Sequence, residues 1–239
     1  MRTMEEKNFK YYDIIMAFFV MILVVSNIAS SAKIVDLKAE LFGLPLAFDG
    51  GTILFPLSYI FGDILTEVYG YKRSRRVIWT GFAALAVSSL VFWGLSLLPG
   101  EAQWQTYAGD AAYAAILGGM SSGGIVLGSL AGYWSGEFSN SVILARLKVI
   151  TDGKMLWLRT ISSTLIGQMI DTTVFVAIAS LFGVFPWSLF WTLTVSNYIF
   201  KVGIEVIMTP LTYKIVKKAK SAEKVDYYDR DTDFNPFLI

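Results

Sequence analysis

The chain has 239 residues, of which 55% are hydrophobic and 16% charged, and its mean hydropathy is +0.56. This composition is more apolar and less charged than that of an average soluble domain, and it is typical of an integral membrane protein. The net charge is +1, and the sequence contains neither cysteine nor histidine. Their absence excludes disulfides, thiolate catalysis and imidazole proton relays, and it removes the usual ligands of zinc and haem. We therefore expect no metal, no cofactor and no catalytic residue.

Six stretches are long and apolar enough to cross a bilayer as helices, which takes about 20 residues each. They cover residues 12–33, 50–70, 77–99, 113–138, 160–184 and 187–212. We predict an all-α integral membrane protein whose six transmembrane helices form one domain over residues 1–220. A charged cytoplasmic tail follows over residues 221–239, and we expect its end to be flexible.

The orientation of these spans follows from the positions of lysine and arginine. The amino-terminal segment, residues 72–76, the loop between the fourth and fifth spans, and the tail together hold 17 of the 20 basic residues. Basic residues accumulate on the cytoplasmic side of membrane proteins. Both termini are therefore predicted to be cytoplasmic, in a multi-pass protein of the inner membrane. The basic residues form no continuous face, so the sequence gives no support to a nucleic-acid partner.

Ionisable side chains interrupt several of the spans. Each such charge costs about 2.5–3.5 kcal/mol at the bilayer centre, so it usually faces the bundle interior, where it pairs or performs a function. In the second span, aromatic and acidic side chains recur every four residues, which places them on one helical stripe. The candidate substrate-binding residues on the spans are Asn27, Phe55, Tyr59, Asp63, Glu67, Trp134, Gln168, Asp171, Asn197, Lys201 and Glu205.

Structural alternatives exist for the acidic residues. Glu67 and Glu137 lie near the inner interface, so each is also placed to pair with the basic loops. For the deeper carboxylates of Asp63, Asp171 and Glu205, the alternative is an ion pair with Lys201. Lys201 stands four residues before Glu205 on the same predicted helix, so these two side chains are also placed to neutralise each other.

The fourth span carries a stripe of glycines at positions 124, 128, 132 and 136. Small residues at this spacing let the backbone of a neighbouring helix approach closely. Packing inside the bundle is one interpretation of the stripe. A homodimer formed through Gly124, Gly128, Gly132 and Gly136 is the other.

Four segments carry a resemblance to a known family. They are SNIASSAKI (26–34), FPLSYIFGDILTEVYGYKRSRRVIW (55–79), NSVILARLKVITDGKMLWLRTISSTLIGQMIDTTVF (140–175) and SNYIFKVGIEVIMTPLTYKIV (196–216). Together they resemble the bacterial and archaeal queuosine precursor transporters, the YhhQ or vitamin-uptake type of membrane protein, over most of the chain. The resemblance implies a six-helix carrier that imports 7-deazaguanine bases, such as 7-cyano-7-deazaguanine or 7-aminomethyl-7-deazaguanine, for salvage into the tRNA nucleoside queuosine.

The polar residues on the spans suit such a base chemically. A guanine-like edge offers N–H donors to a carboxylate, its carbonyl accepts from an amide or ammonium group, and its flat face packs on an aromatic ring. We expect a carboxylate among Asp63, Glu67, Asp171 and Glu205 to accept. A donor is expected among Asn27, Gln168, Asn197 and Lys201, and a ring among Phe55, Tyr59 and Trp134.

Two other functions are compatible with the sequence. A substrate-binding subunit of a vitamin uptake system would need an ATPase supplied by another chain, because no Walker motif is present here. An intramembrane aspartyl protease would use Asp63 and Asp171 as its catalytic pair. The second is disfavoured, because the surrounding residues suit a ligand site better than a protease site.

Overall fold

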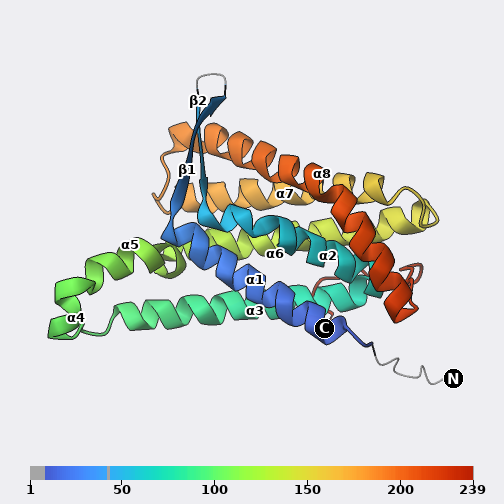
Figure 1. Cartoon of the computed structure of the whole chain (residues 1–239), viewed down its shortest axis with the longest axis horizontal. Helices are drawn as coiled ribbons and strands as arrows, with labels where there is room; N and C mark the ends of the chain where they lie inside the picture. Colours follow the sequence, from blue (N-terminus) through green and yellow to red (C-terminus); the bar gives the residue numbers. More distant parts are fainter. Residues whose placement is uncertain (1–8, 42–43, 239) are drawn as a thin grey trace.

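Helices dominate the computed structural model, which describes residues 9–41 and 44–238. The helices are α1 (Tyr12–Ala32), α2 (Phe55–Tyr69), α3 (Tyr71–Ser96), α4 (Ala102–Tyr107), α5 (Gly109–Ser121), α6 (Gly123–Ile150), α7 (Leu156–Leu181) and α8 (Phe190–Glu223), with short 3-10 turns at Gly50–Ile53 and Trp187–Leu189. The long helices run along the long axis of the molecule, and α8 crosses them obliquely (Figure 1).

Within the described residues, four segments are long and apolar enough to cross a membrane. They are Tyr12–Ala32, Tyr71–Ser96, Gly109–Ile150 and Leu156–Leu181. The prediction of an all-α membrane protein is therefore confirmed at this level. The predicted second span is a helix of only 15 residues preceded by the turn Gly50–Ile53, and the predicted fourth span contains a break at Ser122, where the backbone is extended.

A β-hairpin replaces the loop expected between the first two spans. Strand β1 (Ile34–Leu41) pairs antiparallel with β2 (Leu44–Asp49), so that Ile34 lies opposite Asp49 and Leu41 opposite Leu44. The hairpin follows directly on α1 and projects past α8 (Figure 1). Residues 35–41 alternate strictly between apolar and polar side chains, which is the pattern of a strand with two different faces.

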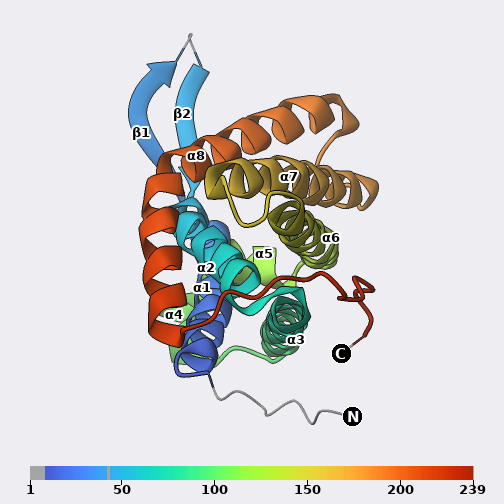
Figure 2. The same ribbon diagram turned by 90° about the vertical axis from the view of Figure 1, so that its right-hand side faces the viewer.

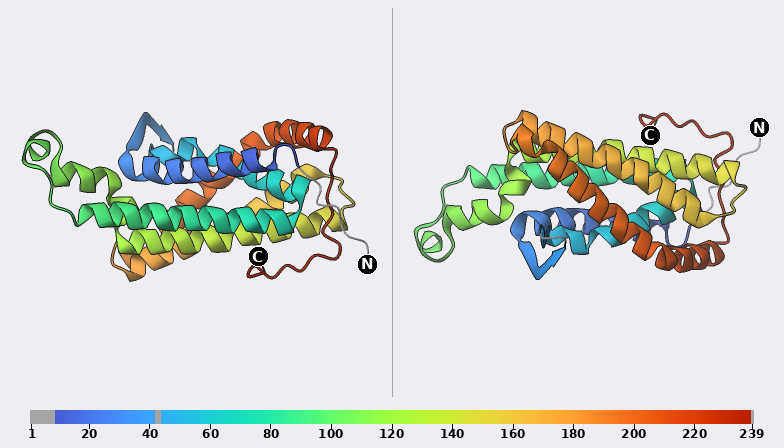
Figure 3. Two further views of the ribbon diagram at one scale, coloured as in Figure 1. Left: turned by 90° about the horizontal axis from the view of Figure 1, so that it is seen from below. Right: turned by 90° about the horizontal axis from the view of Figure 1, so that it is seen from above.

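The glycine stripe of α6 packs against α7 of the same chain, as Figure 3 illustrates for the two neighbouring helices. Gly124 faces the side chain of Phe182, Gly128 faces Phe175, and both Gly132 and Gly136 face Asp171. All four glycines are buried. This confirms packing inside the bundle, and it is evidence against a homodimer through Gly124, Gly128, Gly132 and Gly136, because α7 already occupies the stripe.

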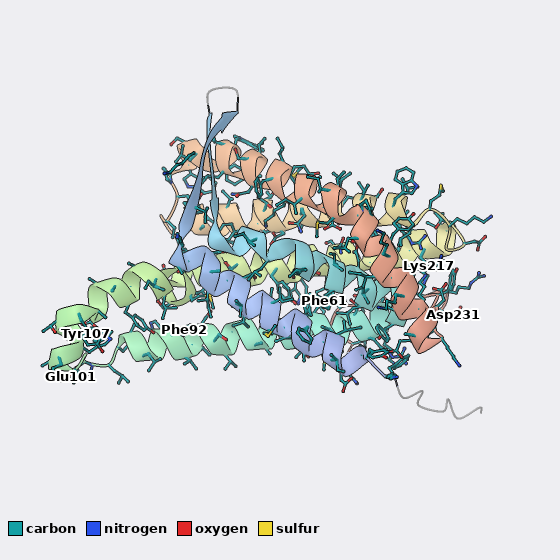
Figure 4. The ribbon with its side chains drawn as sticks, in the orientation of Figure 1. Phe61, Phe92, Glu101, Tyr107, Lys217 and Asp231 are labelled. Atoms are coloured by element: carbon teal, nitrogen blue, oxygen red, sulfur yellow. The ribbon has the colours of Figure 1, made fainter. Side chains whose placement is uncertain are left out.

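The two ends of the described chain meet at one end of the bundle, which we call the basic end. Glu223, the last residue of α8, accepts hydrogen bonds from the backbone N–H groups of Lys10 and Tyr11 at 3.0 and 2.7 Å and from the hydroxyl of Tyr69 at 2.8 Å. A carboxylate is favourable there, because the first N–H groups of α1 have no partner within the helix. Lys217 and Asp231 lie at this end, whereas Glu101 and Tyr107 lie at the opposite one (Figure 4).

Residues 225–238, which we call the strap, run from the end of α8 past α2 to α3 (Figure 2). The N–H of Tyr227 donates to the carbonyl of Val68 at 3.3 Å, and the carboxylate of Asp229 accepts from the N–H of Tyr71 at 3.0 Å. Further along, the indole of Trp79 donates to the carbonyl of Pro236 at 2.8 Å. The tail thus supplies partners to the ends of α2 and α3.

We expect Gly136→Ala to destabilise the protein. A Cβ atom at this position would lie 2.6 Å from Cβ of Asp171 and 3.0 Å from the carbonyl oxygen of Gly167, so α6 and α7 would have to separate. Gly94→Ala on α3 is the matched control, since its Cβ would meet nothing within 4 Å and alanine favours a helix over glycine by about 1 kcal/mol. Thermal unfolding of the detergent-solubilised variants should show a lower midpoint for the first and no loss for the second; equal midpoints would contradict this packing.

Candidate functional site

Several ionisable and amide side chains inside the bundle form two groups. The interior cluster consists of Asp63, Glu137, Asn140, Gln168, Asp171, Lys201 and Glu205, and the basic-end cluster consists of Glu67, Lys148, Arg159, Lys220 and Asp226. Helix α2 contributes one carboxylate to each, Asp63 to the first and Glu67 to the second. The two carboxylates stand four residues apart, yet their surroundings differ completely.

Glu67 is the centre of the basic-end cluster, and its side chain is fully buried. Arg159 on α7 binds it with two hydrogen bonds, from Nε at 2.9 Å and from a terminal guanidinium nitrogen at 2.7 Å. Lys220 on α8 donates to it at 2.6 Å, and Lys148 on α6 lies 3.5 Å away. Two-point binding by arginine is among the strongest charge-assisted contacts in proteins. The cluster therefore joins α2, α6, α7 and α8.

The strap completes this cluster through Asp226. Lys148 donates to the carboxylate of Asp226 at 2.5 Å and to the carbonyl of Tyr227 at 2.7 Å, and Lys220 lies 2.8 Å from Asp226. Burial disfavours the charged form of Asp226, but the hydrogen bonds from Lys148 and Lys220 outweigh this effect and lower the pKa of the carboxyl below its ordinary value. Asp226 therefore stays ionised and balances part of the excess positive charge.

The interior cluster has far fewer compensating contacts. Lys201 on α8 forms an ion pair with Asp171 on α7 at 2.5 Å, so the predicted partnership of this lysine is confirmed for Asp171. Asp63 is 1% exposed, and its oxygen Oδ2 has no hydrogen-bond partner. The side chain of Asn140 on α6 interacts with Asp63. In the described structure, the carboxylate of Asp63 thus has an amide beside it and no ion pair.

Glu205 is the least compensated member of the interior cluster. It is 1% exposed, and within the described part of the chain neither of its carboxylate oxygens has a hydrogen-bond partner. The expected neutralisation of Glu205 by Lys201 is therefore not observed, since Lys201 reaches Asp171 instead. On α7, Gln168 is 8% exposed and its carbonyl oxygen is also without a partner. Buried polar atoms normally have partners, so Asp63, Glu205 and Gln168 are candidates for contact with a ligand.

The remaining predicted site residues lie elsewhere or are not described. Asn27 donates to the carbonyl of Leu23 at 2.8 Å and lines a small cavity between α1, α3, α5 and α6. Trp134 packs in an aromatic cluster with Trp79 and Phe138, with ring centres 6.1 and 5.1 Å away. Asn197 is exposed on α8. Phe55 and Tyr59 belong to α2, but their side chains lie outside the described part of the structure.

Arg159, Lys148, Lys220 and Asp226 were not predicted as members of a buried cluster. The sequence held one signal for them, because pairing with the basic loops was the structural alternative for Glu67, and the structure confirms that alternative. Which basic residues would turn inward was not visible, because in the sequence Lys148 and Lys220 look like any other lysine near a membrane interface.

Comparison with known proteins gives one family and several relatives. A sequence model of the family described as "Putative vitamin uptake transporter" matches residues 49–215. A protein of Bacillus subtilis named "Probable queuosine precursor transporter" is 28% identical over 187 residues, which cover 77% of this chain and 78% of that protein. A protein of the same name from Haemophilus influenzae is 26% identical over 70% of this chain and 67% of its own length.

A third relative, the "Queuosine precursor transporter" of Escherichia coli, is 26% identical over 64% of this chain and 63% of its own length. No solved structure matches the chain. The family match includes α2, α7 and most of α8, and it therefore contains Asp63, Asp171 and Glu205.

We expect Arg159→Met to destabilise the protein strongly, because it leaves the buried carboxylate of Glu67 without its two-point partner. Breaking a buried ion pair from one side typically costs about 3–5 kcal/mol, and each kcal/mol lowers the unfolding midpoint of a chain this long by about 2–4 °C. The control is Lys217→Met, which removes an exposed positive charge from α8 and should leave the midpoint unchanged. The assignment would be contradicted if both variants unfolded at the wild-type temperature.

Proposed function

The chain belongs to the transporter family described as "Putative vitamin uptake transporter" and is a multi-pass protein of the inner membrane, and from this premise we propose that it imports queuosine precursors. The substrates would be 7-deazaguanine bases, such as 7-cyano-7-deazaguanine or 7-aminomethyl-7-deazaguanine, taken up for the modification of tRNA. The names of the three relatives support this proposal. The observation that carries it within the molecule is the set of buried, unpartnered polar atoms in the interior cluster.

The proposal includes six spans with both termini in the cytoplasm. Helices α2 and α8 would be the two further spans. The turn Gly50–Ile53 extends α2 toward the hairpin, and α8 has 34 residues, or about 51 Å at 1.5 Å per residue, which exceeds the hydrocarbon thickness. The basic end, with the strap and the basic-end cluster, would face the cytoplasm in accordance with the distribution of lysine and arginine. The hairpin would lie on the outer side.

The interior cluster would recognise the base by its hydrogen-bonding edge. Asp63 and Glu205 bring free carboxylate oxygens, which would accept from the N–H groups of a guanine-like ring. Gln168 and Lys201 lie on α7 and α8 and would donate to the ring carbonyl, with Asp171 holding Lys201 in place. Phe55 and Tyr59 would pack the flat face, since they share the helical stripe of Asp63. Glu67 would act structurally, because Arg159 and Lys220 occupy its oxygens.

Complementation tests the function directly. Cells that cannot synthesise queuosine precursors and lack their own transporter would express this chain and receive one precursor at low concentration. We expect queuosine to reappear in tRNA, measured by mass spectrometry of digested nucleosides. The absence of queuosine with every precursor, despite normal amounts of the protein in the membrane, would overturn the proposed function.

We expect Asp63→Asn to abolish this rescue while leaving the amount and unfolding midpoint of the protein near wild type, because Asp63 has no ion pair to lose. Glu67→Gln should instead lower the unfolding midpoint, because it removes the negative charge that three cations surround. Asp231→Asn, which neutralises an exposed carboxylate on the strap, is the control for both. Full rescue by a well-expressed Asp63→Asn variant would exclude Asp63 from the substrate site.

A further inference from the structure

Three carboxylates from three helices meet in the interior cluster. Asp63 comes from α2, Glu137 from α6 and Glu205 from α8, and they lie close enough to repel one another. The carboxylate of Glu137 reaches toward α2, since its Oε2 would lie 3.4 Å from a Cβ atom at Gly62, the residue before Asp63. The groups that face these carboxylates are Glu67 on α2, Tyr133 on α6, Asp171 on α7 and Lys201 on α8.

These facing groups do not supply the missing positive charge. Lys201 is in direct contact with Asp171, so this pair is neutral as a unit. Tyr133 donates its hydroxyl proton to the carbonyl of Ile78 at 3.1 Å. Glu67 already has its own cations. If Asp63, Glu137 and Glu205 were all ionised, the interior would hold three uncompensated negative charges inside the membrane.

Such a state is unfavourable, because neighbouring buried carboxylates cannot all stay ionised and retain protons instead. Glu67 shows that this fold is able to bring three cations to a carboxylate one turn away on the same helix. Lys201, the cation that acts on Glu137, is shared with Asp171, so the three interior carboxylates have less positive charge around them than Glu67 has. The neutral base 7-cyano-7-deazaguanine brings no compensating charge, and a single proton on one oxygen neutralises a carboxylate, whereas a metal ion needs several oxygen ligands at once.

A second observation points to a ligand at the same place. Both oxygens of Glu205, Oδ2 of Asp63 and the carbonyl oxygen of Gln168 have no hydrogen-bond partner in the described structure, and all three side chains are more than nine-tenths buried. Of the three carboxylates, Glu137 is the only one whose oxygens are not among these buried, unpartnered atoms, and its residue is partly exposed. Among the three carboxylates, Glu137 is therefore the most accessible from the molecular surface.

We propose that Asp63, Glu137 and Glu205 form a proton-binding site that couples substrate import to proton entry, with Glu137 as the residue that exchanges the proton. The proposal rests on the proposed function. A proton from water on one side binds a carboxylate oxygen, and the same O–H bond breaks when the proton leaves to water on the other side. Asp63 and Glu205 receive the substrate edge, and Glu137 holds the exchanged proton, which removes one of the three negative charges from the loaded site. Glu137 is thus a coupling residue and makes no contact with the substrate.

The test uses the purified full chain in proteoliposomes, with radiolabelled 7-cyano-7-deazaguanine as the neutral probe and a pH-sensitive dye trapped inside. An imposed gradient of one pH unit, acidic outside, should raise wild-type accumulation, by up to about tenfold if one proton enters with each substrate. Addition of the probe without a gradient should acidify the lumen. In Glu137→Gln, exchange of labelled for unlabelled probe should persist, whereas gradient-driven accumulation and lumen acidification should be lost. Asp231→Asn should behave as wild type.

The possible results separate the two proposals. Exchange by the wild type without acidification or response to the pH gradient would overturn proton coupling and leave the proposed function standing. The same would hold if a sodium gradient alone drove accumulation, or if Glu137→Gln accumulated the probe as wild type does. If the folded wild-type protein failed both to bind and to exchange every 7-deazaguanine tested, both proposals would be overturned.

Discussion

The structure depends on the neutralisation of one fully buried carboxylate. Glu67 lies in a short helix that the rest of the bundle surrounds, and its charge is tolerable only because Arg159, Lys148 and Lys220 converge on it from three other helices. Each of these contacts also fixes the position of one end of α6, α7 or α8 relative to α2. The strap adds Asp226 to the two lysines, so the tail belongs to the same electrostatic unit as the helices.

The contrast between Glu67 and Asp63 separates structure from function along a single helix. The two residues share a stripe of α2, but one has three cations and the other has an amide neighbour. If every buried polar atom had a partner within the chain, no hydrogen-bonding atom would be available to a substrate. The unpartnered oxygens of Asp63 and Glu205 are therefore the part of the bundle that the proposed substrate site would use, whereas the oxygens of Glu67 already have partners within the chain.

Much of the fold was predictable because the length of an apolar stretch in the sequence clearly indicates a membrane-spanning helix. The first and fifth spans agree with α1 and α7 to within a few residues, and the third differs mainly because α3 begins earlier, at Tyr71. The hairpin was not among the predicted elements, although residues 35–41 alternate between apolar and polar side chains. The role of the strap was not visible, because its contacts are backbone hydrogen bonds that depend on α2 and α3 being in place.

For the site, the spacing along each helix indicated which acidic residues face inward. It could not predict which side chains of different helices form ion pairs. Lys201 was placed equally well for Glu205 or Asp171 by sequence, and only the packing of α7 on α8 decides for Asp171. The glycine stripe shows the same limit. The spacing of the glycines predicts that another helix packs closely against them. Only the three-dimensional arrangement shows that this helix is α7 of the same chain and not a helix of a second copy.

The order in which the chain is synthesised gives the basic-end cluster a further consequence. Helix α2 leaves the ribosome long before Lys148, Arg159 and Lys220, so Glu67 enters the membrane region with none of its cations. The amino end of α1 likewise waits for Glu223, the final residue of the last helix. Before α8 is synthesised, Glu67 lacks Lys220 and the amino end of α1 lacks the carboxylate of Glu223. The basic-end cluster is therefore complete only after α8 has joined the helices that are made before it.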